Sequence, residues 1–326
     1  MVNAAILILT QNTLERKIYL KTTLYFLFKN FNSIYKYPII ILHEKDYDEK
    51  SKEEIKNGVR GDYKNLIKFK EIDSSDFEIP THIDKEKLIK CIECNPVPYW
   101  RNIRYRLMCY FWIKNFIKYV ENYDYVMRID DDSIIEEKIK NDLFEIIKSK
   151  DHIYMSNLIH IDCGICNYGM KELFETIHPD SNDKLKDMFI STKLKDSDST
   201  FYKFKKLYEI VENKSFDNNE IDIVMPIMYY NNFFITNVNF WKREDVKEII
   251  NKIDNNGNIF YYRYGDAPLH TLIITLLEGD KISRSIFKYS KRLQRECFID
   301  NNNNIHSYMP KDYEHTSCIT MKKKLI

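Results

Sequence analysis

The sequence predicts an α/β sandwich around a mixed, mostly parallel central sheet, and its first 42 residues carry most of that prediction. Residues 4–9 form a short apolar run, 13–31 place apolar side chains near the helical period, and 39–42 are a continuous β-branched run. Strand, helix and strand in this order form a βαβ unit. Strands that are apolar throughout are typical of a parallel sheet covered on both faces.

The rest of the chain continues the alternation of strands and helices. We expect helices over 44–56, 84–94, 101–120, 242–253 and 267–277, and strands over 66–72, 125–129 and 233–240. The lysine- and asparagine-rich stretch 180–220 is expected to be an insertion or a mobile segment. No internal repeat or linker divides the chain, so residues 1–326 are expected to form a single domain.

Composition excludes several classes of protein. The 50 Lys and Arg residues nearly balance 49 Asp and Glu, and a net charge of +1 disfavours a bulk electrostatic nucleic-acid binder. Only seven glycines occur, and their spacing matches neither the GxGxxG motif nor a P-loop. If a nucleotide binds, metal and side chains must therefore hold its phosphates.

No apolar run approaches the roughly 18 residues of a membrane helix, and no basic region precedes residues 4–9. The chain as given is therefore expected to be soluble, without a signal peptide or an integral membrane segment. Its abundance of Ile, Lys and Asn suggests an AT-rich genome, such as that of a protist or a large virus. A host cytoplasm, a viral factory or a virion is the expected location.

Seven cysteines include two pairs at CxxC spacing, Cys91 with Cys94 and Cys163 with Cys166. Two such pairs can bind zinc, but their usual separation is about 15–20 residues. Here the pairs lie far apart and lack glycine-rich knuckles. Ordinary thiols are therefore expected ahead of a zinc site or a disulfide.

The sharpest motif is an acidic cluster directly after a predicted strand. Residues 125–129 run into Asp130, Asp131, Asp132 and Ser133. Strands of an open α/β sheet deliver functional groups at their carboxyl ends, and residues two apart point the same way in extended backbone. Asp130 and Asp132 could therefore hold a divalent cation that clamps a diphosphate. The alternative is an acidic turn that merely ends the strand.

A second motif spans residues 260–270, FYYRYGDAPLH. Gly265 allows a sharp turn, and Pro268 suits the first turn of a helix. Asp266 then either caps that helix or faces a cleft and accepts hydrogen bonds from substrate hydroxyls. His270 fits a core histidine better than a ligand. The chain is also 14% aromatic, which serves core packing or stacking on sugar rings.

These motifs together resemble the fungal Golgi α-1,2-mannosyltransferases of glycosyltransferase family 15. Residues 260–270 are similar to that family's FYERWGDAPVH block. Four further regions follow in the same order, over residues 3–12 with 37–38, 105–109, 125–133 and 232–240. The resemblance implies a GT-A-type, Rossmann-like fold, a GDP-mannose donor, Mn²⁺ or Mg²⁺, and transfer to an α-mannose acceptor with retention of configuration.

Site residues follow from the resemblance position by position. Asp130 and Asp132 match the family's EPD carboxylates and are expected to bind metal and donor. Tyr105 matches its active-site tyrosine, and Asp266 its GDAP aspartate, so both are expected to be catalytic. A late metal-ligand histidine has no clean match; His315 is the first candidate and His306 the second.

Other positions near the expected donor site differ from the family or extend its pattern. Arg128 belongs to the matching strand and is expected to contact the cofactor. Gln11 is assigned the same role, although it replaces a family arginine and weakens any inherited phosphate or base contact. Phe234 replaces a glutamate that is a candidate nucleophile. Transfer would then be front-side, another carboxylate would take part, or activity is lost.

We therefore expect a metal-dependent retaining mannosyltransferase that acts on a glycan or glycoprotein. The resemblance implies that the bond it forms is an α-1,2 linkage. Residues 1–132 would bind the nucleotide sugar and 133–326 the acceptor. The alternatives are a transferase that uses a UDP-hexose, an inactive glycan- or nucleotide-binding protein, and a structural virion or scaffold protein. Nucleic acid is not an expected partner.

Overall fold

The structure is a computed structural model that describes residues 2–96, 101–290, 297–299, 305–307 and 319–321. Its helices are α1 Leu14–Leu27, α2 Ser33–Tyr35, α3 Glu49–Asn57, α4 Lys85–Cys94, α5 Ile103–Tyr110, α6 Leu143–Ser149, α7 Met170–Ile177, α8 Ser181–Leu185, α9 Phe201–Glu212, α10 Val238–Trp241, α11 Glu244–Asn256, α12 Asn258–Tyr261 and α13 Asp266–Glu278. Its strands are β1 Ala4–Leu9, β2 Ile39–His43, β3 Ile67–Glu71, β4 Tyr125–Ile129, β5 Ile134–Ile135, β6 Tyr154–Ser156, β7 Ile159–Ile161, β8 Phe189–Lys195, β9 Glu220–Tyr229, β10 Phe233–Asn237, β11 Ile282–Arg284, β12 Tyr289–Ser290, β13 Cys297–Ile299, β14 Ile305–Ser307 and β15 Ile319–Met321.

Seven strands form the central sheet, in the order β11-β6-β10-β4-β1-β2-β3. Strands β4, β1, β2 and β3 are parallel, so their carboxyl ends lie at one edge. Strand β10 runs antiparallel between β4 and β6. The predicted mixed, mostly parallel sheet is therefore confirmed. The antiparallel strand brings the residues just before β10 to the edge where β1 and β4 end.

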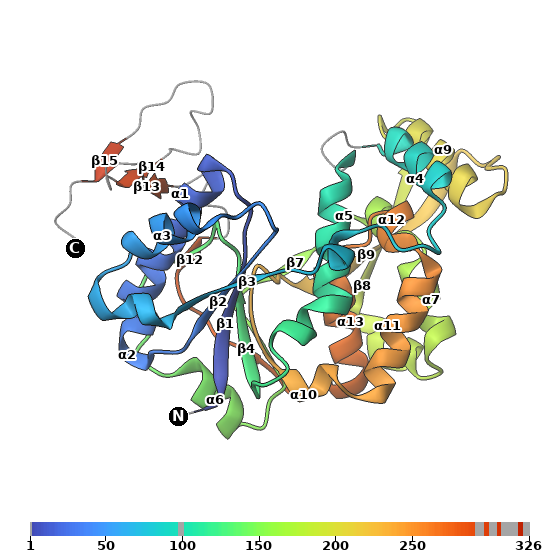
Figure 1. The fold of residues 1–326 in the computed structure, drawn as a ribbon. Coiled ribbons are helices and arrows are strands. Elements are labelled where there is room, and N and C mark those ends of the chain that lie inside the picture. The colour runs from blue at the N-terminus through green and yellow to red at the C-terminus, as the bar shows by residue number, and fades with distance from the viewer. Residues whose placement is uncertain (1, 97–100, 291–296, 300–304, 308–318, 322–326) are drawn as a thin grey trace.

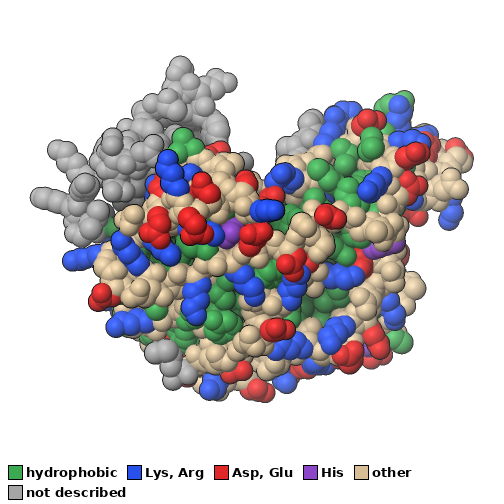
Figure 2. Space-filling view, in the orientation of Figure 1, with side chains coloured by type: hydrophobic (Ala, Val, Ile, Leu, Met, Phe, Trp, Pro, Cys, Tyr) green, Lys and Arg blue, Asp and Glu red, His purple; other side chains and the backbone are tan. Residues whose placement is uncertain are grey.

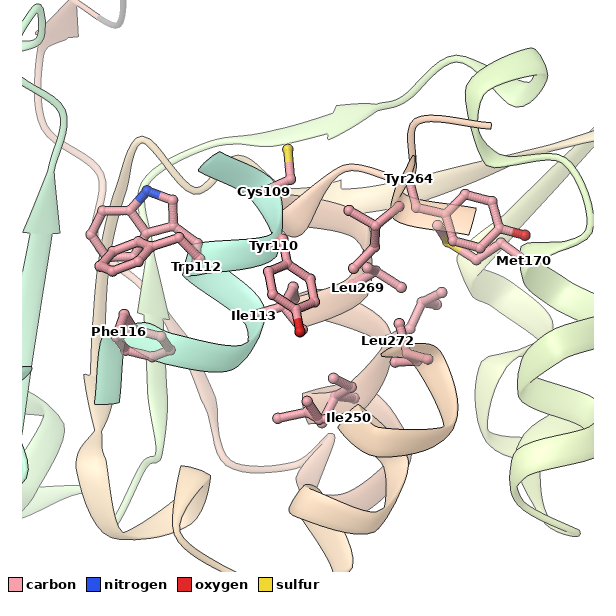
Figure 3. Packing of buried hydrophobic residues seen from close by; sticks show 14 of the residues in the cluster. Cys109, Tyr110, Trp112, Ile113, Phe116, Met170, Ile250, Tyr264, Leu269 and Leu272 are labelled. Carbon is pink, nitrogen blue, oxygen red and sulfur yellow. The ribbon is translucent and has the colours of Figure 1, made fainter. Parts of the chain in front are cut away.

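Both faces of the sheet are covered, as the apolar strands require. Ile6 and Ile8 of β1 pack in one core cluster with α1, whereas Ala5 and Leu7 belong to the other cluster with α5 and α13. Figure 1 shows α1 and α3 on one side of β1 and β4, and α5, α13 and α11 on the other. Tyr110 and Ile113 lie beside Leu269 and Leu272 of α13 in this second layer (Figure 3).

The stretch 180–220 is part of the fold. It contains α8, β8 and α9, and β8 pairs antiparallel with β9 along its whole length. Phe201, Phe204 and Leu207 of α9 are buried in the larger core cluster. Of the two expected alternatives, the mobile segment is wrong here, because apolar residues that lie among the lysines and asparagines are buried in this core.

The long helix expected over 101–120 changes its winding partway. After α5, residues Phe111–Asn115 form a π-helical turn and Phe116–Tyr119 a 3₁₀ turn. Such π turns often occur at functional sites because they redirect side chains and carbonyls. Here the turn contains Trp112, which lies at the cleft described below. None of the helices in the described ranges is long and apolar enough to cross a membrane.

Candidate active site

A cleft of about 380 Å³ opens where β1 and β4 end. Figure 2 shows the molecule hollowed on this side, between the half that carries α1 and α3 and the half that carries α5 and α9. The side chains that line the cleft include the acidic cluster, several aromatic rings and two arginines. They are Leu9, Thr10, Gln11, Arg16, Glu44, Phe77, Asn102, Arg104, Tyr105, Met108, Trp112, Asp130, Asp131, Asp132, Tyr230 and Asn232.

The acidic cluster lies in a turn rather than in extended backbone. The amide of Ser133 donates to the carbonyl of Asp130 at 3.1 Å, so the chain reverses directly after β4. The alternation expected for Asp130 and Asp132 therefore does not apply. Instead, Asp131 and Asp132 share one partner: Nη1 of Arg16 lies 2.8 Å from Oδ1 of Asp131 and 3.2 Å from Oδ2 of Asp132.

Asp131 is the anchored member of the cluster. Its carboxylate also accepts a hydrogen bond from the Thr10 hydroxyl at 2.7 Å, and its carbonyl accepts one from the Thr23 hydroxyl at 2.9 Å. Burial raises the pKa of Asp131, and Arg16 opposes that shift. Asp131 therefore fixes the turn to the end of β1 and to α1.

Asp130 is connected to Asp266 through Arg128. Nε of Arg128 donates to Oδ1 of Asp130 at 2.9 Å, and its Nη1 donates to Oδ2 of Asp266 at 2.6 Å. Asn231, just before β10, donates to the same Asp266 oxygen at 2.7 Å. Burial would raise the pKa of Asp266, but Arg128 outweighs it and the pKa is lowered.

Asp266 is therefore neither a helix cap nor part of the cleft lining. Gly265 is the N-cap of α13, and the Asp266 side chain is 3% exposed beneath the cleft. The sharp turn expected at Gly265 lies at Arg263, whose φ is +86°. In this position Asp266 holds Arg128, and Arg128 in turn holds Asp130. The catalytic role assigned to Asp266 stays a prediction.

Aromatic rings surround the guanidinium of Arg128. Its Cζ lies 3.9 Å from the centroid of the Trp112 ring and 5.9 Å from that of Phe234. Burial opposes the charge, but Asp130 and Asp266 outweigh burial and raise the pKa of Arg128. A permanent positive charge is thus held directly beneath the acidic turn.

His270 supports the Trp112 side of this arrangement. Its Nε2–H donates to the carbonyl of Trp112, 2.8 Å away, at the π-helical turn. The side chain is fully buried, and burial lowers its pKa to about 4. His270 is therefore a neutral core histidine, as the sequence predicted.

Phe234 lies in the core and not in the cleft lining. It is fully buried opposite Arg128 on β4, and its ring packs against Trp112, Phe116 and Tyr154. A phenyl ring there cannot act as a nucleophile. The carboxylates that line the cleft in the described part of the chain are instead Glu44 and the three aspartates of the acidic turn.

Tyr105 and Gln11 both line the cleft. Tyr105 lies on α5, and Gln11 lies just after the end of β1. Tyr105 is 37% exposed, and the Cζ of Arg263 lies 4.8 Å from its ring centroid. Gln11 is exposed and carries an uncharged amide where the resemblance implied an arginine. Arg16, one turn further along, supplies a positive charge at this edge instead.

The donor set at the acidic turn fits a hard divalent cation, which prefers carboxylate oxygen. Burial and Asp132 raise the pKa of Asp130 to about 6, against the effect of Arg128, so negative charge is crowded there. In the described ranges, no three His, Cys, Asp or Glu side chains surround a common point. A third protein ligand would have to come from elsewhere. His315 lies outside the described residues, and His306 lies in β14.

The sequence prediction missed Thr10, Arg16 and Asn231. Thr10 directly follows β1 and Arg16 lies in the first turn of the helix after it, so position after a strand could have found these two. Asn231 precedes β10, and only the antiparallel direction of that strand brings it to the edge where β1 and β4 end. Polar residues at that edge converge regardless of their separation in sequence.

Comparison with known proteins identifies the class to which this fold and cleft belong. Residues 1–301 match the sequence model of a family described as glycolipid 2-alpha-mannosyltransferase, and the chain belongs to this family. Among the curated relatives, the O-glycoside alpha-1,2-mannosyltransferase omh1 of Schizosaccharomyces pombe is 25% identical over 261 residues, covering 76% of this chain and 58% of its own. The glycolipid 2-alpha-mannosyltransferase of Saccharomyces cerevisiae is 24% identical over 259 residues, covering 77% and 52%. The chain thus spans little more than half the length of these relatives.

Two solved structures share the fold. The mannosyltransferase Ktr4p of S. cerevisiae, in complex with GDP, superposes with a TM-score of 0.70 at 21% identity, covering 89% of this chain and 71% of its own. Core-mannan synthase A of Aspergillus fumigatus, in a Mn/GDP form, gives 0.69 at 19% identity, covering 89% and 74%. The glycosyltransferase fold expected from the sequence is confirmed.

Proposed function

We propose that this protein is a metal-dependent glycosyltransferase that moves mannose from GDP-mannose to an α-mannose of a glycan or glycoprotein, forming an α-1,2 linkage with retention of configuration. The observation that carries the proposal is the acidic turn at the end of β4, which lines one cleft together with Arg16, Gln11 and Tyr105. Membership of the mannosyltransferase family and the GDP and Mn/GDP complexes of the two structural neighbours support it.

The acidic turn would hold the donor's diphosphate through a cation. Asp130 and Asp132 would bind Mn²⁺ or Mg²⁺, which offsets the charge of the departing nucleoside diphosphate. Arg128 keeps Asp130 in place from below, and Arg16 restrains Asp132 from the side. Gln11 and Arg16, which line the same cleft, would donate hydrogen bonds to the phosphates or the nucleoside.

Tyr105 would orient the sugar and the acceptor hydroxyl from the opposite wall, contributing mainly proximity. Residues 1–132 supply β1, β4 and the acidic turn, so we assign them the nucleotide-sugar half. Residues 133–326, which include Tyr230 and Asn232 of the cleft, are assigned the acceptor half. Since Phe234 leaves no carboxylate at that position, we infer front-side transfer without a covalent enzyme intermediate.

Phe234 also favours a second candidate, an inactive protein that binds glycan or nucleotide. Release of GDP from GDP-mannose, with methyl α-mannoside as acceptor and with or without Mn²⁺, separates the two. Metal-dependent GDP release with a disaccharide product supports the transferase. A rise in melting temperature with GDP and Mn²⁺ but no GDP release indicates the binder. Release of UDP from a UDP-hexose, without release of GDP from GDP-mannose, would show that the donor is a UDP-hexose.

Asp132→Asn tests the metal assignment directly. We expect loss of Mn²⁺-dependent transfer with little change in the far-UV circular dichroism spectrum. Asp183→Asn, which changes an exposed carboxylate on α8, is the matched control and should keep full activity. Metal-dependent turnover retained in Asp132→Asn would refute the assignment.

A further inference from the structure

The pair Cys163 and Cys166 lies outside the cleft lining and in an unusual turn. The turn Gly164–Asn167 is a 3₁₀ helix between β7 and α7, and Cys163 directly precedes it. At a rise of about 2 Å per residue in this turn, Cys163 and Cys166 are separated by roughly 6 Å along the chain, and Cys163 itself has extended backbone. That separation lies within the range that a disulfide spans.

Gly164 allows this turn to sit against β9. A Cβ at Gly164 would lie 2.1 Å from Cγ2 of Ile223 and 3.1 Å from Met225. Only glycine fits this contact without displacing β9. The turn is therefore fixed by packing, and the two thiols are held in one relative position.

The two thiols differ in the way that an attacking and a resolving cysteine differ. Cys163 is half-buried, and its pKa is lowered to about 7, first by a hydrogen bond from the Cys166 thiol and then by backbone amides of the turn, against burial. Cys166 is fully buried, and Nε of Arg263 donates to its sulfur at 3.2 Å. A partly accessible thiolate beside a buried thiol is the arrangement that favours thiol–disulfide exchange.

The second CxxC pair of the chain provides an internal comparison. Cys91 and Cys94 lie in the last turn of α4, where Cys91 is fully buried and burial raises its pKa to about 12. The CxxC spacing therefore does not by itself make a pair reactive, since Cys91 in the α4 pair is held as a buried thiol. Spacing alone does not account for the properties of Cys163.

We propose that Cys163 and Cys166 are a redox-active dithiol, which a small-molecule disulfide of the glutathione class oxidises to an intramolecular disulfide. The Cys163 thiolate attacks one sulfur of the oxidant, forming a mixed disulfide and releasing one thiolate, which takes up the Cys163 proton. Cys166 then loses its proton and attacks the Cys163 sulfur, releasing the second small thiol. Two electrons pass from the dithiol to the oxidant, and both protons end on the released thiols.

Oxidation of the pair would also change the surroundings of Tyr105, which lines the cleft. A disulfide sulfur is a weaker acceptor than the thiol that Arg263 now contacts, and the guanidinium of Arg263 packs on the ring of Tyr105. The pair is thus separated from the cleft by one arginine side chain. This coupling does not require that the cleft catalyse sugar transfer.

The test uses the full chain in a Cys297→Ser/Cys318→Ser background, treated with oxidised glutathione and analysed by peptide mass spectrometry. We expect a disulfide between positions 163 and 166 that reducing agent reverses, and none between 91 and 94. In the reduced protein at pH 7, iodoacetamide should label Cys163 at least tenfold faster than Cys91.

Two variants distinguish exchange at this pair from general oxidation. Cys166→Ser should trap glutathione as a stable mixed disulfide on Cys163, whereas Cys163→Ser should leave Cys166 unmodified. Circular dichroism checks that each variant folds, and Cys94→Ser, which spares the pair, should behave as the parent. Absence of the 163–166 disulfide in the parent, or of the trapped adduct in folded Cys166→Ser, would overturn the proposal.

Discussion

Nη1 of Arg128 lies 2.6 Å from Oδ2 of Asp266, and both side chains are almost fully buried below the acidic turn. The pair joins the first turn of α13 to the end of β4, two segments 138 residues apart in sequence. Since Nε of the same guanidinium holds Asp130, the position of a cleft carboxylate depends on a residue that does not line the cleft.

Asp266→Asn should therefore destabilise the protein strongly. Removing one partner of a buried ion pair typically costs about 3–5 kcal/mol, and the buried Arg128 would keep only Asp130 as an ionic partner. Urea unfolding measures the loss. The double variant Arg128→Met/Asp266→Leu should lose less than the sum of its single changes, because neither charge is then left alone. Additive losses would show that the two side chains do not interact as described.

Arg16 pairs with both Asp131 and Asp132, so it would compete with a cation bound by Asp132. Arg16→Gln should lower the melting temperature of the metal-free protein, because Asp131 and Asp132 then repel one another without compensation. It should also tighten Mn²⁺ binding about two- to fivefold, since a partly exposed ion pair contributes up to about 1 kcal/mol to the competition. Isothermal titration calorimetry measures this affinity.

The matched control for Arg16→Gln is Arg104→Gln, which changes a more exposed cleft arginine paired with Glu44. It should leave Mn²⁺ affinity unchanged. Weaker Mn²⁺ binding in Arg16→Gln would show that Arg16 supports the cation rather than competing with it. No Mn²⁺ binding by the parent would instead count against the proposed metal site.

Gly164→Ala should destabilise the protein by about 1–3 kcal/mol, the usual cost of overpacking. The new methyl group would overlap Cγ2 of Ile223, which lies on β9 and is buried. Ile223→Ala removes that atom, so the double variant should be more stable than the sum of the single losses predicts. Urea unfolding of the four proteins gives the coupling, and zero coupling would contradict the contact.

The strands and most helices were predictable from local pattern, since a buried strand such as β1 is apolar throughout. Helix α1 begins after Thr13, whose hydroxyl accepts from the amide of Arg16, a signal visible in sequence. Helix α3 begins at Glu49, five residues later than expected, because Asp48 caps it and the charged residues before it form a turn.

The site was less predictable because its contacts are long-range. The acidic turn could be located from residues 125–133 alone, but the geometry of its carboxylates depends on Thr10, Arg16 and Arg128. Whether Asp266 caps its helix or binds Arg128 depends on where α13 packs against β4. No periodicity in the sequence predicts where α13 packs against β4.

The buried imidazole of His270 should make stability depend on pH. Its pKa is about 4 in the folded protein, against an ordinary value of 6.5, because burial disfavours the charged form; Arg128 adds to this effect and Asp266 opposes it. Between those two values the unfolded chain binds the proton more readily, so stability falls as pH falls from 6.5 toward 4. The full effect is on the order of 3 kcal/mol.

Urea unfolding of the parent and His270→Gln at pH 7, 5.5 and 4.5 measures this dependence. The glutamine can still donate to the Trp112 carbonyl but cannot titrate, so the variant should lose less stability than the parent over this range. Asp266 does not confound the comparison, because its lowered pKa removes stability only below about 3.8. Equal pH dependence in both proteins would mean that His270 accepts a proton in the folded state as easily as in water.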